Sequence, residues 1–204
     1  MKAVAQERKD GKSAYFFWKR VMDLVVSLVA GIILLPAMLI IAVLIRLDSE
    51  GMIIFRQERL GKDGAIFTMY KFRTMYMNAE IDGPQLAQEN DARCTRVGRL
   101  LRKSRLDELP QLCNVLKGDM SLVGPRPERK YFYQKYEKTL PDFWSRLQMR
   151  PGITGLAQIN GSYNMPPDEK LKWDMKYAEE CSILLDIKCL FRTLQLMLTG
   201  EGAQ

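Results

Sequence analysis

An uncharged run over residues 24–45 limits how this chain can fold more than any other feature. At about 1.5 Å per residue, a helix of this length reaches roughly 33 Å, enough to cross the hydrocarbon core of a bilayer. Pro36 lies in the middle of the run. Because a proline removes one helical hydrogen bond and clashes with the preceding turn, the sequence predicts a helix that is broken at Pro36.

The basic residues on both sides of this run indicate how it is placed. Residues 1–20 contain six Lys and Arg, and the chain after residue 45 contains the other 25. Basic flanks of membrane segments stay in the cytoplasm. A re-entrant helix that bends at Pro36 keeps both flanks inside, and Ser27 is a candidate partner for backbone groups freed at the bend. The alternative is a single-pass anchor with a proline kink.

Composition narrows the partners of the chain. Its 204 residues suffice for a membrane element of about 30 residues and one globular domain of about 150, and its formal net charge is +7. Such a charge favours anionic partners. Dense basic runs and aromatic-rich basic strands are both absent, so we expect an anionic lipid bilayer and a phosphorylated substrate, and no nucleic acid.

The content of histidine and cysteine limits the chemistry. The chain has no histidine, and its four cysteines lack CxxC spacing, so the sequence does not indicate a zinc site. Any acid–base or nucleophilic chemistry must use Asp, Glu, Lys, Ser, Cys or Tyr. The cysteines are typical of reduced thiols in a cytoplasmic protein.

We expect three parts: a polar tail over residues 1–14, the membrane helix over residues 15–47, and a compact cytoplasmic domain over residues 48–204. The fold class is α/β and mostly helical. Residues 52–55 and 66–72 are strand-like and are separated by a glycine-containing turn, which predicts a small β unit. Further helices are predicted at residues 93–103, 108–117, 128–138, 168–180 and 183–198.

Two of these helices have features that bear on function. In the helix over residues 108–117, Asp107 is placed as the N-cap, Pro110 in the first turn and Gly118 as the C-terminal stop. The last helix is amphipathic, with one apolar face. This face either lies on a bilayer, as an interfacial helix does, or packs in the core. Its residues are Leu184, Ile187, Phe191, Leu194 and Leu198.

Asp107 and Glu108 are the strongest candidates for chemistry. These adjacent carboxylates lie at a predicted helix start within a strongly basic stretch. Free N–H groups at a helix start favour phosphate binding. Nearby cations are expected to lower both carboxylate pKa values, which keeps Asp107 ionised as a nucleophile or metal ligand. The alternative is a helix cap with a surface acid beside it.

Three stiff segments add cations to this pair. They carry Lys71 and Arg73, Arg126 between two prolines, and Arg150 before a Pro-Gly pair. Stiff cations suit bidentate phosphate recognition, because little side-chain order is lost on binding. The chain contains neither a Walker A pattern nor a GxGxxG motif, so nucleotide binding by those loops is not indicated.

Several motifs together resemble the bacterial sugar transferases, the monotopic phosphoglycosyl transferases that begin lipid-linked glycan assembly. The resemblance covers residues 17–198 in family order and is closest to the small, minimal class. The matching segments are KRVMD at residues 19–23, YKFRTM at 70–75, LDELPQL at 106–112, LKGDMSLVGPRP at 116–127 and RPGITGLAQING at 150–161.

This resemblance implies a reaction. Such enzymes transfer a phosphosugar from a UDP-sugar to a membrane polyprenol phosphate, such as undecaprenyl phosphate, and release UMP. They use an Asp-Glu dyad and Mg²⁺. Carried over, Asp107 attacks the sugar-bearing phosphorus and forms a covalent aspartyl-phosphosugar intermediate, while Glu108 assists with metal binding or proton transfer. The reaction is the first membrane step in making exopolysaccharide, capsule, O-antigen or glycoprotein glycans.

The resemblance also implies binding residues and a location. Arg102 and Arg126 would hold phosphate oxygens, and Arg150 would lie near the nucleotide. Lys71, Arg73 and Gln158 are expected to bind substrate as well. The family is placed at the cytoplasmic face of the bacterial inner membrane by a re-entrant helix broken at a proline, here Pro36. Many members have Ser before that proline, whereas this chain has Leu35, which puts in doubt the hydrogen bond that the serine makes. Neither the sugar nor the oligomeric state is indicated by the sequence.

Overall fold

The protein was analysed as a computed structural model that describes residues 2–81, 83, 85, 91–161 and 165–199, with side chains from Lys12 onward. Its longest element is helix α1, Lys2–Asp48. The helix begins well before residue 15, so most of the segment expected as a polar tail over residues 1–14 is helical. Charged residues such as Lys and Glu are good helix formers, and they extend α1 beyond its apolar part.

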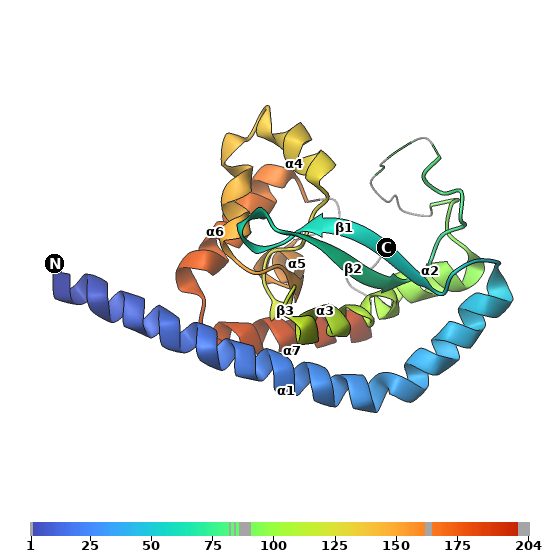
Figure 1. Ribbon diagram of the computed structural model, residues 1–204, viewed down its shortest axis with the longest axis horizontal. Coiled ribbons are helices and arrows are strands. Elements are labelled where there is room, and N and C mark those ends of the chain that lie inside the picture. Colours follow the sequence, from blue (N-terminus) through green and yellow to red (C-terminus); the bar gives the residue numbers. More distant parts are fainter. Residues whose placement is uncertain (1, 82, 84, 86–90, 162–164, 200–204) are drawn as a thin grey trace.

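Helix α1 bends and carries the rest of the protein on its concave side (Figure 1). Pro36 lies inside it, and proline is an ordinary cause of a sharp bend. The predicted break is wrong in one respect, because the helix continues through the proline to Asp48. Ser27 does not serve the bend: its hydroxyl is buried and has no hydrogen-bond partner among the described residues.

The predicted β unit is confirmed. Strands β1, Ile54–Leu60, and β2, Ile66–Phe72, pair antiparallel and are joined by the short 3₁₀ helix η1, Lys62–Gly64. The first strand starts two residues later than expected and extends to the turn. This hairpin lies on the concave side of α1 (Figure 1), and its open end packs against the arm of α1 that follows Pro36, where Phe72 meets Ile41 and Ile45.

A second, smaller sheet was not predicted. Strands β3, Ser121–Val123, and β4, Gly152–Thr154, are parallel and three residues long. Their backbones approach closely because both carry glycine at the contact. A Cβ on Gly124 would collide with the carbonyl oxygen of Arg150, and one on Gly152 would collide with the amide of Gly124. The two glycine-punctuated loops of the sequence therefore form one junction.

The predicted helices are present with shifted ends. The helix predicted at residues 108–117 begins at Gln111. It ends at Gly118, which has a left-handed conformation with φ of 95°. The elements after β2 are α2 Arg96–Lys103, η2 Leu106–Glu108, α3 Gln111–Lys117, α4 Lys130–Glu137, η3 Pro141–Gln148, α5 Leu156–Asn160, α6 Pro167–Glu180 and α7 Ile183–Thr199.

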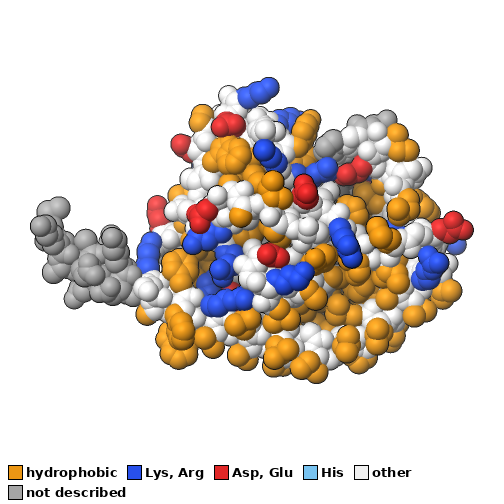
Figure 2. Space-filling view, in the orientation of Figure 1, with side chains coloured by type: hydrophobic (Ala, Val, Ile, Leu, Met, Phe, Trp, Pro, Cys, Tyr) orange, Lys and Arg blue, Asp and Glu red, His pale blue; other side chains and the backbone are white. Residues whose placement is uncertain are grey.

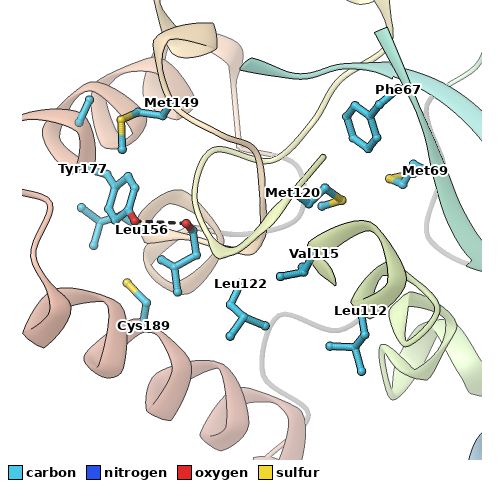
Figure 3. Packing of buried hydrophobic residues seen from close by; sticks show 12 residues of the cluster. Phe67, Met69, Leu112, Val115, Met120, Leu122, Met149, Leu156, Tyr177 and Cys189 are labelled. Carbon is cyan, nitrogen blue, oxygen red and sulfur yellow. Dashed lines mark hydrogen bonds between the residues drawn. The ribbon is translucent and has the colours of Figure 1, made fainter. Parts of the chain in front are cut away.

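The main core joins the two sheets to α3, α6 and α7. Val115, Met120 and Val123 are fully buried there, and side chains from β2, α3, β3, α6 and α7 meet in one cluster (Figure 3). Tyr177 of α6 reaches the centre of this cluster, with its hydroxyl 3.2 Å from the carbonyl oxygen of Val123. The core therefore fixes the β3–β4 junction against α6.

Both arms of α1 are attached to this one domain. On the arm before the bend, Lys19 donates a hydrogen bond of 2.9 Å to the fully buried Asp186 of α7, and Asp23 accepts one of 3.1 Å from the amide of Leu122. On the arm after the bend, Ile41 and Ile45 pack in a second core cluster. The domain thus contacts α1 on both sides of Pro36.

The outward face of α7 is apolar. Leu184 and Phe191 are 78% and 69% exposed, and Ile187 and Leu194 are also exposed. The interpretation that this predicted stripe packs in the core is therefore wrong for these residues, while the side chain of Leu198 lies outside the described ones. The outward face of α1 is apolar too, and hydrophobic side chains gather along it in Figure 2.

A buried ion pair links η3 to α6. The Nε of Arg146 lies 2.6 Å from Oδ2 of Asp174, and both side chains are 1% exposed. The same guanidinium donates a hydrogen bond of 3.0 Å to the carbonyl oxygen of Arg126. Arg146 therefore holds the loop that follows β3.

Asp174→Asn is expected to lower the thermal unfolding midpoint in detergent micelles, because it leaves the Arg146 charge buried and uncompensated, at a cost of about 3–5 kcal/mol. Asp168→Asn is the matched control. Asp168 lies on the same helix in an exposed pair with Lys172, a kind of pair that contributes only about 0.3–0.5 kcal/mol. Equal midpoints for the two variants would contradict the role given to Asp174.

Candidate active site

The two candidate carboxylates lie in η2, the short turn between α2 and α3. Arg105 precedes this turn in a left-handed conformation, with φ of 56°, which is uncommon for a residue with a side chain. The chain therefore turns sharply after α2 and places Asp107 and Glu108 inside the protein. Asp107 does not cap α3 as predicted, because Pro110 occupies the N-cap position.

Two cations hold Glu108. The Nζ of Lys71, on β2, lies 2.7 Å from Oε1 of Glu108, and Nη2 of Arg126 lies 2.6 Å from the same oxygen. Lys71 also faces Asp107, but its Nζ is 3.7 Å from Oδ2, beyond hydrogen-bonding distance. Charge-assisted hydrogen bonds of this length are strong. Glu108 is thus firmly fixed, whereas Asp107 is held more loosely.

The two carboxylates consequently differ in pKa. Burial opposes ionisation of Glu108, but Arg126 and Lys71 outweigh it and hold its pKa far below the ordinary value. Burial raises the pKa of Asp107, and the attraction of Lys71 does not compensate. The prediction that cations lower both values is correct for Glu108 and wrong for Asp107, because the shorter contacts all go to Glu108.

The pair faces a cavity of about 730 Å³, within the range of small-molecule sites. Among the described residues, its wall contains eleven Lys and Arg but only four Asp and Glu. An excess of one charge in a concave site concentrates ligands of the opposite charge. The cavity is therefore suited to an anionic ligand with more than one negative charge.

Several guanidinium groups in this wall have a buried N–H group without a hydrogen-bond partner among the described residues. There are four such groups: Arg59 Nε, Arg73 Nε, Arg102 Nη1 and Arg146 Nη1. Buried donors are nearly always paired, and leaving one unpaired costs about 1–3 kcal/mol. Four such donors around one cavity indicate that a ligand with acceptor oxygens completes the site.

The structure brings most of the predicted site residues together. Lys71, Arg102, Arg126 and Gln158 all line the cavity beside the carboxylate pair. Arg102 is positioned by a hydrogen bond of 3.0 Å from its Nε to the hydroxyl of Thr74. These residues come from β2, α2, the loop after β3 and α5.

Arg73 borders the cavity, but most of its guanidinium is engaged by the end of α1. It donates there to the backbone carbonyl oxygens of Ile45, Ser49 and Glu50. Carbonyl groups at a helix end need such donors. Arg73 therefore anchors the end of α1, and its buried Nε is the one guanidinium nitrogen of this side chain that has no partner among the described residues.

Arg150 is half-buried and is not among the described residues that line the cavity. Its carbonyl oxygen packs against Gly124 in the β3–β4 junction. Its predicted place near the nucleotide stays a prediction.

Seven cations of the wall were missed in the sequence. They lie outside the motifs that drew attention, and an arginine in a strand or loop gives no sign of where it points. Arg146 is the clearest case, since only the fold shows that it is buried beside the site. The seven are Arg56, Arg59, Arg93, Arg105, Arg129, Arg146 and Lys170.

A metal site that the chain builds alone is not evident. The described residues contain no group of three or more His, Cys, Asp and Glu side chains that could hold an ion. The adjacent carboxylates of Asp107 and Glu108 still fit Mg²⁺, because this ion is usually held by one or two carboxylates together with substrate phosphates.

Comparison with known proteins adds an independent finding. The sequence profile described as Bacterial sugar transferase matches residues 14–200. The chain belongs to this family. A UDP-N-acetylgalactosamine-undecaprenyl-phosphate N-acetylgalactosaminephosphotransferase of Aeromonas hydrophila is 45% identical over 93% of this chain and 46% of its own length.

Two other relatives have more similar lengths. A UDP-glucose:undecaprenyl-phosphate glucose-1-phosphate transferase of Caulobacter vibrioides is 42% identical over 91% of this chain and 71% of its own length. The exopolysaccharide production protein PSS of Rhizobium leguminosarum is 40% identical over 90% of this chain and 97% of its own length. The chain thus spans about half the length of some curated relatives and nearly all of others.

Arg73→Met is expected to lower the thermal unfolding midpoint, because three carbonyl groups at the end of α1 lose a charged donor, each such hydrogen bond contributing about 1.5–3 kcal/mol. Arg56→Met is the matched control, since Arg56 is an exposed cation on the paired strand. If the two variants unfold at the same temperature in detergent micelles, Arg73 does not anchor the helix.

Proposed function

We propose that this protein transfers a phosphosugar from a UDP-sugar to a membrane polyprenol phosphate, giving polyprenyl-diphospho-sugar and UMP. The observation that carries the proposal is the loosely held Asp107 beside the fixed Glu108, in a cavity whose wall is strongly cationic. The printed names of the relatives support it, since they describe UDP-sugar donors and undecaprenyl phosphate as the acceptor.

Asp107 is the nucleophile in this proposal. Its carboxylate oxygen attacks the phosphorus that bears the sugar, the bond from that phosphorus to the bridging oxygen breaks, and UMP leaves with the electron pair. An oxygen of polyprenol phosphate then attacks the same phosphorus, and the aspartyl–phosphorus bond breaks. Asp107 is regenerated without a net proton, so the absence of histidine from the chain is no obstacle.

The other residues of the site position and stabilise charge. Glu108, fixed by Lys71 and Arg126, holds the turn that carries Asp107 in place. Arg59 and Arg102 supply buried donors for phosphate oxygens. Asp107 and Glu108 would hold Mg²⁺, which would supply positive charge that neutralises part of the diphosphate.

The acceptor reaches this site from the membrane. Exposed apolar residues line the cavity close to the end of α1, namely Met52, Phe55 and Met77. An isoprenoid chain is apolar, so such a surface suits its passage from the bilayer to the phosphate site. The cationic wall suits the phosphate of the acceptor as well as that of the donor.

The attachment of α1 supports a re-entrant position at the cytoplasmic face of the bacterial inner membrane. The part of α1 from Lys12 to Asp48 contains an apolar stretch and is long enough to cross a membrane. A crossing helix would carry its two ends to opposite sides, yet one domain contacts α1 both before and after Pro36. The exposed apolar face of α7 then lies in the headgroup region as an interfacial helix.

Asp107→Asn is expected to reduce UMP release at least about 10³-fold, because the amide is a poor nucleophile toward phosphorus. Donor labelled with ³²P at the sugar-bearing phosphate should label the wild-type protein when the acceptor is omitted, through a bond that hydroxylamine cleaves. The Asp107→Asn protein should stay unlabelled. Asp168→Asn, a surface control outside the cavity wall, should behave as wild type.

The covalent route and the reaction itself can fail separately. Rapid formation of lipid product with no label on Asp107 at any time would show direct transfer between the two substrates. Wild-type turnover by Asp107→Asn would show that another group is the nucleophile.

Single cysteines at Ser13 and Lys62, in a chain whose four natural cysteines are replaced, are expected to react with a membrane-impermeant maleimide only from the cytoplasmic side. Both positions are exposed and lie before and after the apolar part of α1. A cysteine at Ile33, which is 70% exposed on the apolar face, should react from neither side. Labelling of Ser13 and Lys62 from opposite sides would rule out the re-entrant position.

A further inference from the structure

The side chain of Gln158 is left without partners at the site. It lies on α5 and lines the cavity. Its Oε1 and Nε2 are both buried, and neither has a hydrogen-bond partner among the described residues. A buried donor and a buried acceptor on one group are costly to leave unpaired, so a ligand that pairs with both is the natural explanation.

The backbone around Gln158 connects it to the loop that carries Arg126. Gly155, just before α5, packs so tightly against Gly124 that an added Cβ would collide with the carbonyl oxygen of Gly124, and this Cβ would lie 2.8 Å from Oε1 of Gln158. The loop that begins at Gly124 carries Arg126, which reaches Glu108. Gln158 and the carboxylate pair therefore belong to one rigid wall.

The wall residues that lie near Gln158 in the sequence are mostly apolar, unlike those of the arginine-rich part. Ala157 and Gly161 line it on one side of α5, and Met165, Pro166 and Pro167 line it at the start of α6. Mostly apolar surfaces with a small number of well-placed polar groups are typical of small-molecule sites. This part of the cavity suits a base, whereas the arginine-rich part suits phosphates.

We propose that Gln158 recognises the uracil base of the nucleotide donor by a cyclic pair of hydrogen bonds to its imide edge. The inference rests on the proposed function, since it takes the donor to be a UDP-sugar. In uracil, N3–H and the neighbouring carbonyl oxygen point to the same side. A primary carboxamide presents one donor and one acceptor side by side, so Nε2 donates to the carbonyl oxygen and Oε1 accepts from N3–H.

An acetamido group on the sugar would offer the same kinds of atoms in a less suitable arrangement. Its secondary amide is trans, so its N–H and C=O point to opposite sides. One carboxamide can then meet only one of them, and the other atom of Gln158 would stay unpaired. The base satisfies both atoms and is therefore the better partner.

The test measures binding of UMP and of N3-methyl-UMP to the full chain in nanodiscs, by equilibrium dialysis. Methylation removes the N3–H donor and leaves the phosphate unchanged. A change of base would be less clear, because the carboxamide can turn over and also pair with cytosine. Wild type is expected to bind UMP at least about tenfold more tightly than N3-methyl-UMP.

Gln158→Met should remove this discrimination. Methionine keeps the length and the apolar contacts of the side chain, so we expect UMP to bind about tenfold more weakly and the two nucleotides to bind within about threefold of each other. Gln148→Met is the matched control, because Gln148 is an exposed glutamine of η3 outside the cavity wall. It should retain the wild-type ratio.

Each contrary result has a distinct meaning. Equal binding of the two nucleotides by wild type, which needs no variant to fold, overturns the inference, as does persistent discrimination in Gln158→Met. If Gln158→Met instead loses only a preference between UDP-N-acetylglucosamine and UDP-glucose, the residue reads the sugar and the assignment to the base is wrong. Failure of wild type to bind UMP at all would contradict the proposed function itself.

Discussion

A fully buried carboxylate is stable only when donors surround it, and Asp186 has them from two elements. Lys19 and Tyr15 reach it from α1, and Tyr177 reaches it from α6. Removing Lys19 would leave the charge of Asp186 in the interior without compensation. This network ties α1 to the core that holds the β3–β4 junction, so the position of α1 and that of the active-site wall are set together.

The β3–β4 junction in turn positions the side chains of the candidate active site. Gly124 and Gly152 let two backbones meet at a distance that any side chain would prevent. The side chain of Arg126, just after the junction, donates to Glu108, while Arg146 donates to the carbonyl oxygen of Arg126. The ion pairs of Glu108 are consequently fixed by backbone contacts rather than by flexible surface side chains, which is how a site keeps reacting groups in place.

Sequence patterns predicted what depends on local chemistry. The hairpin between β1 and β2, the left-handed stop at Gly118 and the apolar stripe of α7 follow from turn residues and periodicity, and all are present. Contacts between distant segments were not predictable in this way. Arg73 and Arg150 look alike in their stiff segments, yet one caps α1 and the other lies outside the cavity wall. The shape of the turn before Asp107 likewise depends on the unusual conformation of Arg105.

The two adjacent carboxylates differ in pKa because, among the described residues, two cations contact Glu108 closely and none contacts Asp107 at hydrogen-bonding distance. Lys71 could have been shared equally, but it lies 2.7 Å from Glu108 and 3.7 Å from Asp107. A carboxylate bound by two cations is a weak nucleophile, because its electron pairs are already engaged, whereas one held at a distance keeps them available. Pairs of acids whose environments separate their pKa values commonly divide their roles in this way. In the proposed reaction, the same asymmetry would allow one phosphate site to serve both half-reactions, since Asp107 would react while Glu108 maintains the shape of the site.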